Sequence, residues 1–234
     1  MKLKPLPLVL MAAFAAPLAA QSAETSPHTF TGNVGLYSDY AFRGVSQTDE
    51  NPAIQGGFDY AHASGFYLGT WASNVTEKFL NGSNLEMDFY GGYAGSVGDL
   101  GFNVGLLQYY YPGQTSGLDI DTLEAYAGVT WKWFGLKASY SIDDYFGVAN
   151  SDGTVYWDAS FNYELPAKVM LGLHYGYTAG EGAQDDYSDY KVSLTKEFGG
   201  FNFGLAYVAT DDDGEDLYGD YADDRVIVSI SKTF

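Results

Sequence analysis

The sequence predicts an all-β fold, a transmembrane antiparallel up-and-down β-barrel of about twelve strands, and three observations support it. Apolar and polar residues alternate in about a dozen segments, the connections between them alternate between short and long, and the last segment ends on an aromatic residue. In membrane barrels the strands alternate apolar outward and polar inward residues, and short periplasmic turns alternate with longer extracellular loops. The three observations therefore indicate the same fold in the same membrane.

The N-terminus has the order of a secretory signal peptide. Lys2 and Lys4 provide a charged start, an apolar stretch follows at residues 6–16, and small residues lead up to Ala20. We therefore expect residues 1–20 to be a signal peptide that is cleaved after Ala20. An uncleaved anchor helix is the alternative, but this stretch is shorter than the about 20 apolar residues that span a bilayer.

The rest of the chain is expected to be a short periplasmic segment, residues 21–28, followed by the barrel, residues 29–234. An even number of strands is expected if both ends of the barrel lie on the periplasmic side. The alternation predicts strands at 30–43, 54–62, 66–74, 84–94, 102–110, 121–131, 136–141, 154–165, 169–177, 189–198, 201–209 and 225–234.

The predicted connections fall into two length classes. The short ones are residues 63–65, 132–135, 166–167 and 199–200, and the long ones are 44–52, 75–83, 111–118, 142–153, 178–188 and 210–223. One connection, residues 95–101, has a middle length and departs from the pattern. The short turns are expected in the periplasm and the long loops outside the cell.

The last predicted strand has the features of a closing strand. Val226, Val228, Ile230 and Phe234 share one face, while Arg225 lies on the other. A soluble β-sandwich is the alternative, but its edge strands would need protection by Pro, Lys or bulges, which few of these segments carry. The terminal Phe234 resembles the residue that the barrel-assembly machinery recognises in outer-membrane barrels, and we expect it to be the assembly signal here.

The charge balance limits the possible partners. The chain has 30 acidic and 11 basic residues and a formal charge of −19, which the loss of Lys2 and Lys4 with the signal peptide would change to −21. Such a surface repels nucleic acid and favours cationic or neutral solutes. The chain has no cysteine, so thiol chemistry is excluded.

Charged residues within the strands are candidates for the lumen. A Lys or Arg that faces the middle of the bilayer costs about 2–4 kcal/mol, so such side chains are expected to point inward. The predicted lumen-lining residues are Asp39, Arg43, Asp59, Glu86, Asp88, Glu124, Lys137, Asp158, Glu164, Lys191 and Arg225, together with Asp189, Glu197 and Lys168. Acids outnumber bases in this set, which would favour cations in a water-filled lumen.

The same charges could instead pair across the barrel and plug it. Barrels of eight strands are filled by side chains and those of 16–18 leave channels, so a barrel of about twelve strands allows both outcomes. Four tyrosines on the inward face, Tyr37, Tyr90, Tyr126 and Tyr156, are expected to narrow the bore and to restrict any pathway to small solutes.

The sequence gives little support for a catalytic site or a metal site. His174 could meet Ser160 or Ser193 on a neighbouring strand, as an outer-membrane lipid hydrolase would require, but His174 faces the lumen rather than lipid. The acidic segment 211–216 lacks the spacing of a calcium-binding loop and is expected to be a solvated loop. We expect no catalytic residues, no metal site and no cofactor.

Several segments resemble a known family. They are SDYAFRGVSQT at 38–48, NPAIQGGFDY at 51–60, SGFY at 64–67, WASNV at 71–75 and LEMDFYGGY at 85–93, which are similar to the TorF-type family of proteobacterial outer-membrane porins. The resemblance is concentrated in residues 30–95. It implies an outer-membrane location and leaves the solute open.

Together these observations predict an outer-membrane channel for passive diffusion of small hydrophilic solutes, with a preference for cations. The alternative is a closed barrel with a structural or surface-contact role and no transport. The expected partners are outer-membrane lipid and lipopolysaccharide, the barrel-assembly machinery and small hydrophilic solutes, and the chain is expected to be a monomer.

Overall fold

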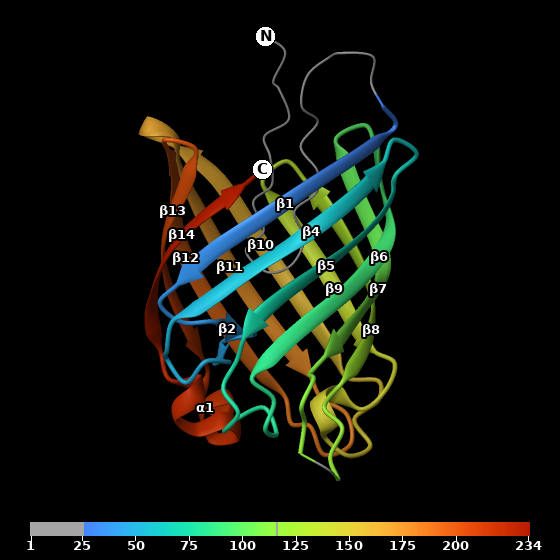
Figure 1. Ribbon diagram of the computed structural model, residues 1–234, viewed down its shortest axis with the longest axis vertical. Helices are drawn as coiled ribbons and strands as arrows, with labels where there is room; N and C mark the ends of the chain where they lie inside the picture. Colours follow the sequence, from blue (N-terminus) through green and yellow to red (C-terminus); the bar gives the residue numbers. More distant parts are fainter. Residues whose placement is uncertain (1–25, 116) are drawn as a thin grey trace.

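The computed structural model describes residues 26–115 and 117–234, and within them twelve antiparallel strands form one closed barrel (Figure 1). The predicted fold class is confirmed, and each predicted strand corresponds to one strand of the barrel. The signal peptide predicted at 1–20 lies outside the described residues. The barrel strands are β1 (His28–Tyr37), β4 (Ala53–His62), β5 (Phe66–Asn74), β6 (Leu85–Val97), β7 (Leu100–Tyr110), β8 (Thr122–Trp131), β9 (Phe134–Ser141), β10 (Val155–Leu165), β11 (Val169–Ala179), β12 (Tyr187–Phe198), β13 (Phe201–Thr210) and β14 (Arg225–Thr233).

The barrel closes where β14 pairs with β1. The register runs from Asn33 opposite Thr233 to Tyr37 opposite Ser229. Beyond this ladder, the backbone N–H of Phe234 donates to the carbonyl of Gly32 at 2.9 Å, and the N–H of Gly32 donates back at 2.7 Å. The last residue is therefore part of the seam; its role as an assembly signal stays a prediction.

The connections separate the two ends of the barrel. The short turns lie at the end where β1 begins and β14 ends, which we call the turn end, and the long loops lie at the opposite end, the loop end (Figure 1). The prediction that residues 95–101 form a connection of middle length was wrong. Val97 pairs directly with Leu100, so that only Gly98 and Asp99 form the turn, with Gly98 at a φ of +61°.

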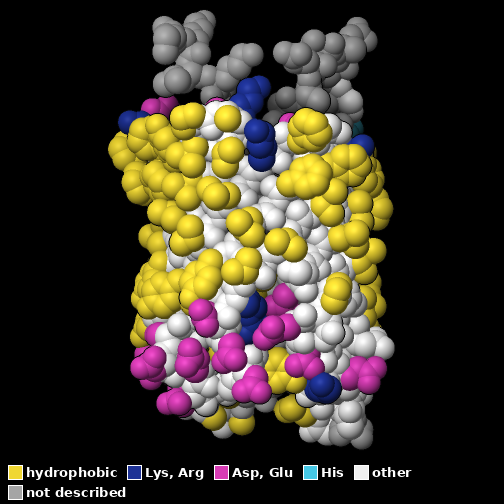
Figure 2. Space-filling model, turned by 90° about the vertical axis from the view of Figure 1, so that its left-hand side faces the viewer, with side chains coloured by type: hydrophobic (Ala, Val, Ile, Leu, Met, Phe, Trp, Pro, Cys, Tyr) yellow, Lys and Arg dark blue, Asp and Glu magenta, His cyan; other side chains and the backbone are white. Residues whose placement is uncertain are grey.

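The outer wall of the barrel is apolar. Phe58 is 69% exposed and Val226 61%, and large apolar side chains alternate along every strand with residues that face inward. Figure 2 shows apolar side chains over the wall and acidic side chains gathered at the loop end. A soluble sandwich would bury the apolar set instead, so this arrangement suits a lipid environment. Among the described residues, no helix has the length and apolar character needed to cross a membrane.

Three loops at the loop end contain secondary structure that the alternation did not predict, and one of them contains the 3₁₀ helix η1 (Tyr145–Gly147). The first predicted strand was expected to continue to residue 43, but β1 ends at Tyr37, and β2 (Ala41–Phe42) and β3 (Val45–Ser46) form a small hairpin. The reason is the turn at Arg43 and Gly44, where φ is 47° and 84°, because two positive φ values close a tight hairpin.

The acidic segment in the last loop is a helix rather than an irregular loop. Helix α1 (Asp212–Tyr218) is followed by the 3₁₀ helix η3 (Gly219–Ala222), and the side chain of Asp211 accepts a hydrogen bond from the N–H of Gly214 at 3.1 Å. Carboxylates in a first turn interact favourably with the helix dipole, and Asp is a preferred N-cap. The cluster of acids is thus explained by helix formation.

Candidate functional site

The loop-end half of the barrel interior is filled by residues 38–52, which we call the inner loop. Val45, Ser46, Gln47 and Thr48 are all buried. The Tyr40 hydroxyl donates to a carboxylate oxygen of Glu86 on β6 at 2.9 Å. Residues 43–48 of the inner loop therefore lie inside the barrel rather than above it.

Arg43, at the tip of the inner loop, forms a buried ion pair with the barrel wall. Its Nη2 lies 2.7 and 2.9 Å from the two oxygens of Glu124 on β8, and the two side chains are only 4% and 1% exposed. The guanidinium also lies 4.2 Å from the ring centroid of Tyr156 on β10. Although burial alone would lower the pKa of Arg43, the charge of Glu124 holds that pKa well above its usual range. Arg43 therefore stays charged at any physiological pH.

The ion pair is only partly satisfied. Among the described residues, Nε and Nη1 of Arg43 are buried without a hydrogen-bond partner. A buried ion pair offsets its desolvation cost only when the remaining donors are also bonded. The contact thus fixes the position of the inner loop without stabilising it strongly.

Gly44 allows the tip of the inner loop to approach the opposite wall. A Cβ at Gly44 would lie 2.6 Å from Cγ2 of Thr210 and 2.8 Å from Cβ of Asp189. The positive φ of Gly44 disfavours other residues as well. The hairpin therefore reaches across the bore, from Glu124 on one side to β12 and β13 on the other.

A second ion pair holds the base of the inner loop. Nη1 of Arg225 on β14 lies 3.2 Å from Asp39, whose other oxygen accepts hydrogen bonds from the hydroxyls of Ser46 and Thr48, each at 2.7 Å. Arg225 also donates to the backbone carbonyls of Asp220, Tyr221 and Asp223. One side chain thus joins the inner loop to the segment that follows α1.

We expect Arg225→Lys to loosen both loops. A lysine keeps the charge but cannot reproduce several directed hydrogen bonds, and losing bonds to a charged group costs about 1.5–3 kcal/mol. The temperature at which the folded band is lost on a heat-modifiable gel should fall. Lys196→Arg, on the exposed part of β12, is the matched control; an equal fall in both variants would contradict the role of Arg225.

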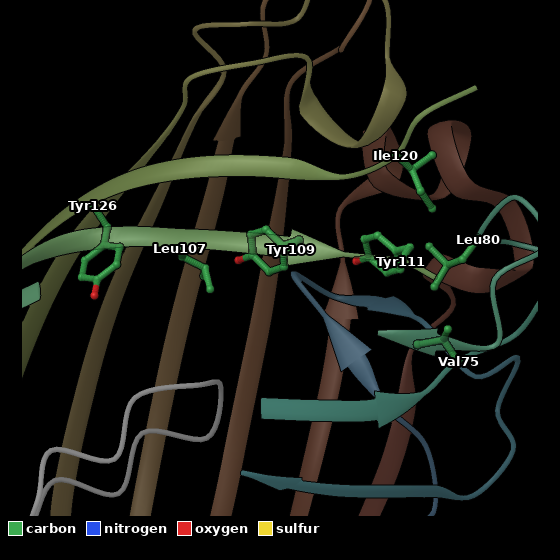
Figure 3. Packing of buried hydrophobic residues seen from close by; sticks show 7 residues of the cluster. All are labelled: Val75, Leu80, Leu107, Tyr109, Tyr111, Ile120 and Tyr126. Atoms are coloured by element: carbon green, nitrogen blue, oxygen red, sulfur yellow. The ribbon is translucent and has the colours of Figure 1, made fainter. Parts of the chain in front are cut away.

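Aromatic and aliphatic side chains complete the closure of the loop-end half. Leu107, Tyr109 and Tyr111 project together from β7 and its end (Figure 3). Phe42 of the inner loop packs edge-on against Tyr109, with ring centroids 5.5 Å apart, and against Phe146, 5.6 Å apart. The buried cluster consists of Val75, Leu80, Leu107, Tyr109, Tyr111, Ile120 and Tyr126. This half of the barrel is packed as a protein core.

The turn-end half is different, because its inward face carries small residues. The register aligns Gly101, Thr130, Gly135 and Ser160 in one row across four strands. A cavity of about 290 Å³ lies beside them. The interior is therefore closed at one end and hollow at the other.

The tyrosines of the inward face lie along the wall rather than across the bore. Tyr67, Gly92, Gly105 and Tyr126 form one register row across β5 to β8, and the two tyrosine hydroxyls hydrogen-bond to each other above the glycines. A Cβ at Gly92 would lie 2.6 Å from the Tyr67 hydroxyl. The expectation that Tyr37, Tyr90, Tyr126 and Tyr156 narrow the bore stays a prediction.

Tyr90 repeats this arrangement in the next row. A Cβ at Gly69 would lie 2.5 to 2.7 Å from the Tyr90 ring and hydroxyl, and that hydroxyl donates to Asp59 on β4 at 2.6 Å. Cross-strand packing of an aromatic ring on a glycine covers the bare backbone. We call Tyr67, Tyr90 and Tyr126 the tyrosine wall.

His174 on β11 lies among carboxylates. Its Nε2 is 2.8 Å from Asp189 and its Nδ1 is 3.3 Å from Asp158. Ser160 is the register partner of His174, but both ring nitrogens already face acceptors, so the imidazole is not placed as the base of a Ser-His pair. Among residues 26–115 and 117–234, no group of three or more His, Asp or Glu is placed to hold a metal ion.

The comparison with known families gives one match. Residues 21–234 match a family described as bacterial proteins of unknown function (Gcw_chp). The chain belongs to the Gcw_chp family. A comparison with curated proteins found no match.

Solved porin structures share the fold of this Gcw_chp barrel. One is the KdgM porin in complex with disordered oligogalacturonate, with a TM-score of 0.57 and 10% identity over 88% of this chain and 99% of that chain. Another is the NanC porin, with a TM-score of 0.54 and 12% identity over 88% of this chain and 98% of that chain. The likeness shows a porin-type barrel; the TorF-type resemblance stays a prediction.

The predicted lumen residues of the Gcw_chp barrel fall into three groups. Asp39 and Arg43 lie on the inner loop, where they meet Arg225 and Glu124. The strand register places the following residues on the inward face of the wall, the same face as Glu124 and Arg225: Asp59, Glu86, Asp88, Lys137, Asp158, Glu164 and Lys191. Lys137 is the register partner of Asp158, whereas Glu164, Lys168 and Glu197 lie exposed near the turn end, away from this network.

Sequence reasoning missed the residues that make the Gcw_chp barrel asymmetric. The inner loop is positioned in part by Tyr40, Tyr109 and Gly44. None of them is charged, so a search for charged lumen residues did not find them. Gly44 was the available signal, because a glycine at the end of a predicted strand often marks a turn.

Proposed function

We propose that this protein is an outer-membrane channel for small hydrophilic solutes, and that the inner loop closes it at the extracellular end. The observation that carries the proposal is the contrast between the two halves of the interior. A hollow lined by small residues and by the tyrosine wall occupies the turn end. The loop end is filled by a loop whose tip is held to the wall through an incompletely bonded ion pair. A loop can leave the bore, whereas a strand cannot.

Several further observations support this proposal. The apolar outer wall suits lipid, the porin fold of the structural neighbours suits the outer membrane, and short turns belong to the periplasmic side of such barrels. Lipid, lipopolysaccharide and the assembly machinery are the partners that this location implies. Three of the charges buried inside the barrel, Glu86, Glu124 and Arg225, bind the inner loop.

Conductance in planar bilayers tests the channel. We expect wild-type protein to show brief or rare openings, and a variant in which residues 41–46 are replaced by a Gly-Ser linker to show sustained discrete openings. Heat-modifiable gel mobility would verify that both proteins are folded. If neither protein gives a discrete opening at any voltage, the second candidate function stands: a closed barrel with a structural or surface-contact role, which the packed loop-end half favours.

We also propose a preference for cations. The six loops at the loop end, residues 38–52, 75–84, 111–121, 142–154, 180–186 and 211–224, contain 20 acids and only two bases, Arg43 and Lys78. An acidic mouth concentrates cations and repels anions. In a KCl gradient, the reversal potential of the linker variant should have the sign of a cation-selective pore, and the sign of an anion-selective pore would contradict the preference.

A further inference from the structure

We propose that the tyrosine wall in the turn-end cavity is a binding site for a neutral pyranose sugar. The inference rests on the proposed function, because it names the class of solute that the channel would carry. It is carried by the placement of Tyr67 and Tyr90, by the way in which their rings are fixed, and by the polar groups around the cavity.

Tyr67 and Tyr90 offer ring faces to the cavity. The Tyr90 ring lies on Gly69 of the neighbouring strand, and the Tyr67 side chain runs along the wall so that its hydroxyl lies over Gly92. Both tyrosines line the cavity and both are partly exposed. Two adjacent rows of the barrel thus form a flat aromatic platform.

Hydrogen bonds hold these rings in place. The Tyr67 hydroxyl donates to Asn103 at 2.5 Å and also contacts the Tyr126 hydroxyl, and the Tyr90 hydroxyl donates to Asp59 at 2.6 Å. Rings that are already ordered lose little conformational entropy when a ligand stacks on them. The tyrosine hydroxyls already make hydrogen bonds within the barrel, so the apolar ring faces are the part of the wall that a ligand can contact.

Polar groups surround this platform. Asp59, Asn103, Lys137, Asp158 and Ser160 all line the same cavity, and the volume of about 290 Å³ is near the lower end of the about 300–1,000 Å³ of ligand pockets. A molecule that fits has a flat apolar face and a rim of hydroxyl groups. A pyranose has one face of C–H groups and hydroxyls around its edge, so it meets both requirements.

The charges and the shape argue against other ligands. Lys137 lies directly opposite Asp158 on the neighbouring strand. The cavity therefore carries charges of both signs and does not favour an anion or a cation. A quaternary ammonium ion is recognised by aromatic rings that enclose it, whereas these rings lie side by side on one wall. A neutral sugar is therefore the ligand that the geometry supports.

Saturation-transfer NMR on the refolded full chain in detergent tests the inference with glucose as probe. We expect glucose protons to receive saturation from wild-type protein, and we expect at least a tenfold loss with Tyr90→Leu. Ala94→Trp, which fills the cavity from β6 and leaves the wall intact, should cause the same loss. Ala159→Trp, on the outward face of β10, should leave the signal unchanged.

The outcomes separate the sugar site from the channel. No saturation of glucose by wild-type protein, an undiminished signal in Ala94→Trp, or a stronger signal for galacturonate or tetramethylammonium would each overturn the inference. Glucose binding without any conductance would support the sugar site and contradict the channel. Conductance of the linker variant without glucose binding would support the channel and contradict the sugar site.

Discussion

Replacing Arg43 by Met should open the barrel at the loop end. Removing one partner of a buried ion pair costs about 3–5 kcal/mol, because the other charge, here Glu124, stays buried and unpaired. Since each 1.4 kcal/mol is a factor of ten, the population with the inner loop displaced should rise by about a hundredfold or more. The measurement is the open probability of single channels in planar bilayers.

The double variant Arg43→Met/Glu124→Leu is the matched control. Replacing both members of a buried pair by apolar residues of similar size is often neutral, so closure should largely return. If the single and the double variant open equally and more than wild type, loss of the Arg43 contacts displaces the inner loop, and the unpaired charge of Glu124 does not. If neither differs from wild type, the packing of Phe42 and Tyr40 holds the loop without the ion pair.

Gly92→Ala should destabilise the barrel itself. A Cβ at this position would meet the backbone carbonyl of Val104 and lie 2.9 Å from the Cα of Gly105, so β6 and β7 would have to separate. Overpacking costs about 1–3 kcal/mol and more where backbone must move. The folded band on a heat-modifiable gel should disappear at a clearly lower temperature than in wild type.

The neighbouring residue provides the control for this prediction. Gly91 lies on the opposite face of β6, and a Cβ there would lie 3.3 Å from its nearest neighbour, the carbonyl oxygen of Tyr67. Gly91→Ala should therefore change the transition temperature much less than Gly92→Ala. Equal effects of the two substitutions would show that loss of backbone flexibility, rather than the close contact at Gly92, causes the change.

The strands of the barrel could be predicted from the sequence because their signal is local. A period of two along residues such as Val226, Val228 and Ile230 is visible without knowing which strand lies next to them. The same holds for the length of the connections, except at 95–101, where a two-residue turn at Gly98 was hidden between small residues that continue the strands.

The closure of the loop end could not be predicted in the same way. Arg43 and Glu124 are 81 residues apart, and Asp39 and Arg225 are 186 residues apart. Alternation assigns each of these side chains to the interior, but it does not say that two of them leave the wall with a loop. Helix α1 was missed for a related reason, since its acids are also typical of a solvated loop.

The contact between Asp39 and Arg225 also couples the inner loop to the closure of the barrel. Arg225 begins β14, the strand that completes the barrel, while Asp39 follows β1 directly. The base of the inner loop therefore lacks its ion pair with Arg225 until β1 and β14 have paired. A variant that weakens the pairing of β1 with β14 would therefore also loosen the inner loop, although the two are separate elements of the barrel.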